Sequence, residues 1–175
     1  MTCMNKFNYF NTERLFAERL QESHLEFIHQ MHQNERVMKY LGGKRTPEQT
    51  ADYMELNLSH WEKYGYGIWV LRENASEDFI GRGGLRNTVL GGKDEVEVAY
   101  GFLPEFWNKG LATEFTKEVM RIGYSEIRLS SLVSIAHQNN MASHAVLGKV
   151  GFEFEREMIY KGEPYLLFRH DNLQL

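Results

Sequence analysis

The sequence has little of what marks a secreted or membrane-spanning protein. Its single cysteine, Cys3, excludes an internal disulfide, as expected for a reducing compartment. No apolar run approaches the ~18 residues that a membrane-spanning helix needs, and the opening segment MTCMNKFNYF lacks the layout of a signal peptide. We therefore expect a cytoplasmic protein without a membrane partner.

The sequence also lacks an excess of positive charge. Its 20 Lys and Arg residues stand against 24 Asp and Glu residues, for a formal net charge of −4. This balance argues against a nucleic-acid partner, because phosphate binding is driven by clustered cations, and it mildly favours a cationic or amine-bearing partner. The length of 175 residues fits one domain with a full core, so we expect a single domain over residues 1–175.

Hydrophobic periodicity predicts about seven strands and about four helices. The strands are expected at residues 14–20, 68–71, 79–85, 95–102, 132–136, 152–154 and 165–168. The helices are expected at residues 22–33, 47–64, 111–124 and 140–149. The second helix has a strong start signal, with Thr46 as N-cap, Pro47 in the first position and Gln49 three residues after the cap.

The order of these elements predicts a mixed α/β sheet with helices on its faces. A strand, a helix and a second strand follow one another between Glu95 and Ala136, and this order requires a crossover connection. The two strands are therefore expected to be parallel neighbours or near neighbours. The early strands are joined by short turns, which favours antiparallel pairing.

The stretch FWNKGLATE, residues 106–114, joins the strand at 95–102 to the next helix. The start of a helix leaves backbone N–H groups unsatisfied and attracts anions, above all phosphates. Gly110 and Ala112 are small enough for a phosphate to approach the backbone, and Lys109 adds a positive charge. Alternatively, Gly110 only permits a tight turn and Ala112 is only a good helix former. The nucleoside-triphosphate loop and the dinucleotide fingerprint are both absent, since Gly81-Arg82-Gly83-Gly84 is followed by strand-like residues.

Three segments together resemble the GNAT N-acetyltransferases, and more narrowly the branch that contains the ribosomal-protein N-terminal (Rim-type) acetyltransferases. The segments are residues 96–114, residues 140–152 and the strand opening Thr12-Glu13-Arg14-Leu15. The resemblance extends from Thr12 to about Phe168. It departs from the branch pattern at three positions: Ala99 and Asn108, where the branch has Gly, and Trp107, where the wider family has Gln or Arg.

The resemblance implies a GNAT-like mixed sheet in which two parallel strands splay apart, with acetyl-CoA entering the V-shaped opening. The strands end near Phe102 and Ala136. The backbone amides that follow are expected to hold the pyrophosphate, and the exposed strand backbone the pantetheine, in the manner of an added strand. A strand N–H would also point at the thioester oxygen. The expected cofactor-binding residues are Tyr100, Gly101, Phe102, Trp107, Asn108, Lys109, Gly110, Leu111, Ala112, Thr113 and Asn140.

Glu97 is the candidate general base. Strand alternation places it on one face with Ala99 and Gly101, and these small residues leave room for a substrate beside the carboxylate. An amine with a pKa near ~10 must lose a proton before it attacks. The alternative is a solvated strand residue paired with a Lys or Arg. Glu95 lies on the same face and is the second choice.

Ser143 is the candidate that protonates the leaving thiolate. The wider family often uses a Tyr seven residues after the Asn, but this position is Leu147. The Rim-type branch implies a serine three residues after Asn140, and Ser143 shares a helical face with Val146 and Leu147. The alternative is a hydroxyl bonded to its own preceding turn. Asn140 is expected both to cap the helix and to contact CoA.

Other residues are assigned less specific places. His29 and His32 share a helical face without a third metal ligand, so we expect solvated residues and no metal. The aromatic residues Trp61, Tyr64, Tyr66 and Trp69 are interpreted as core rather than as an acceptor-site lining. The acceptor pocket is expected between the two early helices and residues 37–46, where Glu35 and Asp52 are candidates to attract a cationic amine or are simply surface residues.

The predicted activity is transfer of the acetyl group of acetyl-CoA to a primary amine, either a protein N-terminus or a small molecule. A CoA-binding regulatory module without turnover is an alternative that the same cofactor motif supports. A nucleotide-binding switch is a third reading, and it requires stabilisation by ATP or NAD and none by CoA. The chain is expected to be a monomer or a homodimer.

Overall fold

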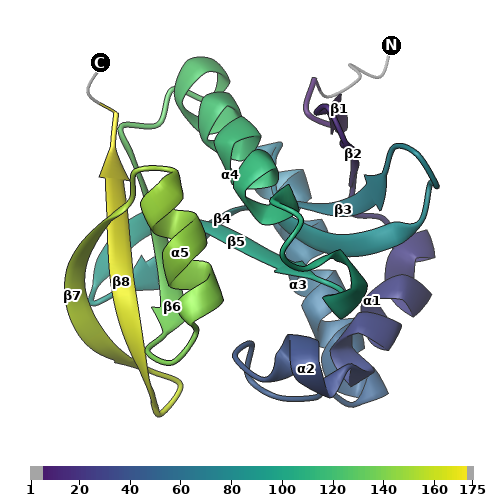
Figure 1. Ribbon diagram of the computed structural model, residues 1–175, viewed down its shortest axis with the longest axis horizontal. Coiled ribbons are helices and arrows are strands. Elements are labelled where there is room, and N and C mark those ends of the chain that lie inside the picture. Colours follow the sequence, from purple (N-terminus) through teal and green to yellow (C-terminus); the bar gives the residue numbers. More distant parts are fainter. Residues whose placement is uncertain (1–5, 173–175) are drawn as a thin grey trace.

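The computed structural model describes residues 6–172, so Cys3 lies outside the described residues. Within that range the strands form one sheet in the order β1-β2-β3-β4-β5-β6-β8-β7 (Figure 1). Their bounds are β1 (Tyr9–Asn11), β2 (Leu15–Arg19), β3 (Ile68–Glu73), β4 (Phe79–Leu90), β5 (Lys93–Phe102), β6 (Ser131–His137), β7 (Glu153–Tyr160) and β8 (Glu163–Asp171). The predicted mixed sheet is confirmed, and the three-residue strand β1 is an addition to it.

The helices follow the predicted order. They are α1 (Leu25–Gln33), α2 (Glu35–Met38), α3 (Pro47–Tyr64), α4 (Leu111–Arg121) and α5 (Met141–Lys149), with short helical turns η1 (Glu22–His24), η2 (Pro104–Phe106) and the π-helical η3 (Ile122–Glu126). The predicted start of α3 is confirmed, because the Gln49 amide donates to Thr46 Oγ1 and the Thr46 amide donates to Gln49 Oε1. None of the helices in residues 6–172 is long and apolar enough to cross a membrane.

One pair of strands departs from the antiparallel pattern. Strands β5 and β6 are parallel, and the register pair that joins them is Glu97 with Val133. The Ser134 hydroxyl adds a hydrogen bond of 2.9 Å to the Val98 carbonyl. Toward Phe102, no further pair joins these two strands in the described part of the chain. This is the predicted splayed pair, and it opens toward the start of α4.

The helices cover opposite faces of the sheet. A Cβ atom at Gly83 would overlap the ring of Phe115 on α4, whereas one at Gly101 would overlap Met31 on α1. Figure 1 shows α4 and α5 in front of the sheet with α3 behind it. The two faces of β5 therefore meet different helices, α4 on one side and α1 on the other.

The aromatic cluster is mostly core, as predicted. Trp61 and Trp69 are fully buried, with ring centroids 5.3 Å apart in an edge-on arrangement. Tyr66 is buried and its hydroxyl donates to Asn87 Oδ1 at 2.8 Å. Tyr64 lies at the surface with 38% of its area exposed. The core interpretation thus holds for three of the four residues.

Candidate functional site

The loop before α4 is shaped by two residues in the left-handed conformation. Asn108 has φ of 59° and Gly110 has φ of 78°. Glycine adopts this conformation without strain, and among the other residues asparagine tolerates it best. Asn108 therefore adopts a conformation that glycine, the residue of the related motif at this position, also adopts.

The start of α4 presents unused backbone donors. Gly110 is the N-cap residue and supplies no side-chain cap. In the described part of the chain, no hydrogen bond uses the amide of Leu111, Ala112 or Thr113 as its donor, whereas the Glu114 amide donates to the Gly110 carbonyl at 3.0 Å. The helix N-terminus also carries a partial positive charge. These three amides fit an anion, and the small Gly110 and Ala112 leave the backbone accessible.

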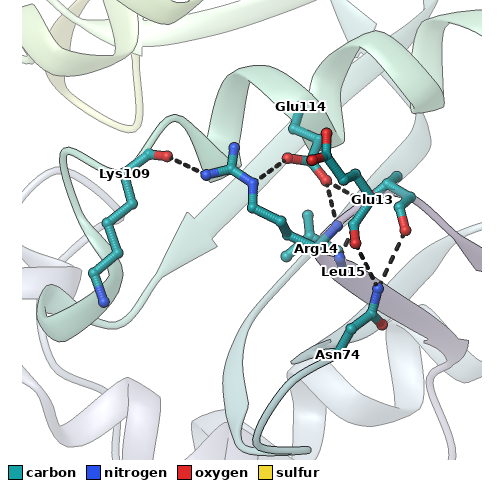
Figure 2. Close-up of polar contacts among 7 residues, drawn as sticks. Glu13, Arg14, Leu15, Asn74, Lys109 and Glu114 are labelled. Atoms are coloured by element: carbon teal, nitrogen blue, oxygen red, sulfur yellow. Dashed lines mark hydrogen bonds and ion pairs between the residues drawn. The ribbon is translucent and has the colours of Figure 1, made fainter.

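Glu114 ties this loop to the beginning of the chain. Its Oε1 accepts hydrogen bonds from Thr12 Oγ1 at 2.6 Å and from the Arg14 amide at 2.9 Å. Its Oε2 accepts from Arg14 Nε at 2.7 Å, and the same guanidinium donates to the Lys109 carbonyl at 2.7 Å (Figure 2). Burial raises the pKa of the Glu114 carboxyl, but the hydrogen bonds from Thr12 and Arg14 more than offset it and leave that pKa below its usual value.

The turn that carries Arg14 is itself stabilised by Asn74. The side-chain amide of Asn74 donates to the carbonyls of Thr12 and Glu13, each at 3.2 Å, as Figure 2 shows. The segment Thr12-Glu13-Arg14-Leu15, noted in the sequence as a strand opening, therefore stabilises the loop from Lys109 to Glu114. The two segments are far apart in the sequence and are joined by these hydrogen bonds.

The end of β5 lines the opening between the splayed strands. Phe102 packs edge-on against Phe115, with ring centroids 6.3 Å apart, and its carbonyl accepts a hydrogen bond of 2.7 Å from the Trp107 indole. Burial raises the pKa of Tyr100 to about 12, an effect that the nearby Ser143 hydroxyl partly offsets. No group among the described residues meets hydrogen-bond geometry at the Tyr100 hydroxyl. Tyr100 thus reaches from β5 toward α5 with an unused hydroxyl.

Asn140 and Ser143 are brought together at the start of α5. Asn140 Oδ1 accepts from the Ser143 amide at 3.2 Å, which is the expected N-cap. Asn140 Nδ2 donates to Ser143 Oγ at 3.2 Å. Within residues 6–172, the Ser143 hydroxyl makes no hydrogen bond to a carbonyl of the preceding turn. Its proton is therefore free for another acceptor.

Glu97 is buried, with 4% of its area exposed. The alternative of a solvated residue is wrong in that respect, although its partner is an arginine as that alternative expected. Arg86 Nη2 donates to Glu97 Oε2 at 2.6 Å, and the Glu97 charge raises the pKa of Arg86. No hydrogen bond in the described residues uses Glu97 Oε1. The second choice, Glu95, is engaged by Arg169 at 2.7 Å.

Two surface cavities lie away from these residues. One of about 560 Å³ lies near the end of α4 and is lined by residues such as Arg121, Glu155 and Arg169. The other, of about 410 Å³, lies by β2. Neither is lined by any residue of the loop before α4 or of the splayed strand pair. Assignment of the site therefore depends on its exposed donors and carboxylate, not on enclosed volume.

A family model described as an acetyltransferase (GNAT) domain matches residues 14–153. The chain belongs to the GNAT acetyltransferase family. Membership makes this GNAT protein an acyltransferase that depends on acetyl-CoA, as the sequence predicted. The matched range includes the supporting turn at Arg14, the loop before α4 and the start of α5.

Known proteins resemble this GNAT chain over nearly its whole length. The uncharacterized N-acetyltransferase YoaA of Bacillus subtilis is 26% identical over 165 residues, which cover 91% of this chain and 93% of that protein. The acetyltransferase of Agrobacterium tumefaciens has a TM-score of 0.82 at 20% identity, covering 94% of each chain. The spermidine N-acetyltransferase of Vibrio cholerae, solved with CoA and spermine, has a TM-score of 0.74 at 17% identity, covering 91% of this chain and 95% of that one. The two structures show a shared fold.

On the opposite face of the sheet from α4, the GNAT chain buries polar residues that the sequence predicted to be in solvent or did not single out. His32 was expected in solvent, but it is fully buried and its Nδ1 lies 3.0 Å from Thr50 Oγ1. His29 Nδ1 lies 3.4 Å from the same hydroxyl, so Thr50 provides a polar partner for both imidazole rings. Arg82 is buried as well, with 5% exposed. Arg82 and Arg86 are four residues apart and therefore lie on the same face of β4. This spacing was the sequence signal for their shared burial, but the glycines around them obscured the alternating pattern of the strand.

Proposed function

We propose that the protein is an N-acetyltransferase of the Rim-type branch, a single cytoplasmic domain spanning residues 1–175. It transfers the acetyl group of acetyl-CoA to a primary amine by direct attack with general-base assistance. The observation that carries this proposal is the set of unused amides at Leu111, Ala112 and Thr113, presented behind a left-handed turn at the mouth of the splayed strands.

The donor half of the site fits CoA by its chemistry. The backbone from Trp107 to Thr113 would hold the pyrophosphate, since helix N-terminal amides and a partial positive charge suit phosphate. Lys109 adds a charge at the exposed rim. The β5 backbone from Tyr100 to Phe102 and the side chain of Asn140 would contact the pantetheine.

Acetyl-CoA supplies an activated thioester, and the protein's residues position the amine and move protons. Glu97, through its free Oε1, takes the proton that the amine gives up as its nitrogen bonds to the acetyl carbon. Ser143 passes a proton to the sulfur as the carbon–sulfur bond breaks and the electron pair leaves with sulfur. The Ser143 oxygen takes a proton back from solvent and Glu97 releases one to solvent, so that one proton in total moves from the amine to the thiol. Asn140 Nδ2, which already donates to Ser143 Oγ, stabilises the oxygen during that transfer.

Release of CoA thiol with a panel of amines tests the proposal. Glu97→Gln should lower kcat by a factor on the order of 10² to 10⁴, with the acetyl-CoA-induced rise in Tm retained. Ser143→Ala should lower kcat at high pH less than at low pH if the hydroxyl relays a proton. Glu153→Gln, at an exposed carboxylate, is the matched control.

Two results would contradict the enzyme proposal. A rise in Tm with acetyl-CoA but no turnover with any amine, together with an unchanged Glu97→Gln protein, would favour the regulatory module without catalysis. Stabilisation by ATP or NAD and none by CoA would favour a nucleotide-binding protein.

A further inference from the structure

Three arginines gather on the Glu97 face of the sheet, where α1 and α3 lie. Arg82 and Arg86 stand four residues apart on β4 and pair in register with Gly101 and Glu97 of β5. Arg45 comes from the segment before α3. The Arg45 and Arg82 guanidiniums lie 4.9 and 5.4 Å from the centroid of the Tyr53 ring. One aromatic ring of α3 therefore contacts two cations.

These cations outnumber the carboxylates available to them. Arg86 is paired with Glu97 at 2.6 Å. Arg45 and Arg82 make no ion pair with any described residue. Arg82 is 5% exposed and its Nε has no hydrogen-bond partner in the described part of the chain. A buried charge without a partner is costly, so this arrangement lacks a counter-anion.

Neutral polar groups beside the arginines are also unused. The Tyr53 hydroxyl and His32 Nε2 are buried and have no hydrogen-bond partner among residues 6–172. Burial, together with the charges of Arg45 and Arg82, lowers the pKa of His32 to about 3. Burial and the charge of Arg82 lower the pKa of Arg45. The region thus has a positive potential in a chain whose net charge is −4.

The arginine cluster lies next to the proposed base. Arg86 joins the two directly through its ion pair with Glu97. Ala99 lies between Glu97 and Gly101 on β5 and opposite Gly84 of β4, which itself separates Arg82 from Arg86. Gly84 and Gly101 lie between the unpaired guanidinium and the carboxylate. The backbone of Gly67 covers Gly84, and the side chains of Met31 and Leu41 cover Gly101. An acceptor molecule with its amine at Glu97 would bring its other end toward Arg82 by displacing the flexible side chains of Met31 and Leu41.

We propose that Arg82 and Arg45, with the Tyr53 hydroxyl, bind an oxyanion carried by the acceptor amine, either a carboxylate or a phosphate. This inference rests on the proposed function and narrows its substrate class to anionic amines. It reverses the expectation from net charge, which favoured a cationic partner. It also separates this chain from an enzyme acting on a polyamine, whose positive charges the arginines would repel.

A binding experiment tests the anion site without catalysis. Tm is measured for the wild type and Arg82→Gln in chloride, phosphate and acetate buffers of equal ionic strength. Both proteins keep the loop before α4, so the difference between them reports Arg82 alone. We expect a larger anion-induced rise in Tm for the wild type, and an unchanged or higher Tm for Arg82→Gln in chloride, because the variant removes a buried unpaired charge. Arg128→Gln, at an exposed arginine, should behave like the wild type.

Matched amines then identify the anion. CoA release is compared for 6-aminohexanol and 6-aminohexyl phosphate, and for hexylamine and 6-aminohexanoate, because Arg82 and Glu97 lie four strand residues apart in register. We expect kcat/KM to favour the anionic member of one pair by about tenfold or more, as for hydrogen bonds to charged groups. Arg82→Gln should bring that ratio close to one, and Arg128→Gln should preserve it. The favoured pair distinguishes phosphate from carboxylate.

The inference and the proposed function fail in different ways. Equal anion responses in the wild type and Arg82→Gln, or a preference for spermine over every anionic amine, would overturn the arginine site and leave acetyl transfer intact. No turnover with any amine would overturn the enzyme. In that case the anion-induced difference in Tm still decides whether Arg82 binds an anion.

Discussion

The two faces of β5 differ in the groups that they contact. On one face, Val98, Tyr100 and Phe102 turn toward α4, and Phe102 packs against Phe115. On the other face, Glu97 pairs with the Arg86 guanidinium and Gly101 is covered by α1. The α4 side presents backbone amides at the start of that helix, whereas the α1 side presents charged side chains. In the proposed function, the donor would be held by backbone groups and the acceptor would be selected by side chains.

The largest expected effect is on the α4 face. Phe115 is fully buried and contacts the rings of Phe10 and Phe102. Phe115→Ala should lower the free energy of unfolding by about 3–5 kcal/mol, measured by urea denaturation. Phe154→Ala, at a ring that is 56% exposed, should cost much less. Equal losses in the two variants would mean that α4 does not anchor this face.

On the α1 face, we expect a pH effect of intermediate size. His32 has a pKa of about 3 in the folded protein and an ordinary value of 6.5 when unfolded. Between these values the unfolded chain binds a proton that the folded chain does not, so stability falls as pH falls. From about pH 7 to about pH 5 the loss from His32 should be about 2 kcal/mol.

Substitution of His32 isolates this contribution. His32→Gln should flatten the dependence of unfolding free energy on pH by that amount. A lowered pKa at His24 and His60 should maintain part of the slope in this variant. An identical slope in His32→Gln and the wild type would contradict the buried neutral ring.

The smallest effect on stability is expected in the loop before α4. Asn108→Val places a β-branched residue at φ of 59° and should cost roughly 1–2 kcal/mol, with a matching loss of CoA affinity in calorimetry. Asn108→Gly is the matched control and should retain both. If the valine variant bound CoA as well as the glycine variant, the left-handed turn would not shape the anion site.

The helix starts and the strand β5 were largely predictable because their signals are local. The N-caps at Thr46 and Asn140 and the alternation of β5 are each determined within a few residues. The left-handed turn at Gly110 is of the same kind. Such patterns can be identified without knowing what packs against them.

The α1 face was poorly predicted because its features are tertiary. Burial of His32 depends on Thr50, which is 18 residues away. The environment of Arg82 depends on Tyr53 from another helix. Strand β1 was missed since its three residues give no periodicity and pair only through β2. Net charge, a property of the whole chain, gave no indication of a local excess of arginine.

The hydrogen bonds of Glu114 have a consequence for the order in which the protein is completed. They join groups 100 and 102 residues apart in the sequence, so closing this contact carries a large entropic cost and is expected late in folding. The turn at Arg14 is synthesised long before the loop before α4, so it must wait for that loop before the contact can form. CoA would then be captured only by chains whose two distant parts have already met, and its binding would report a finished fold.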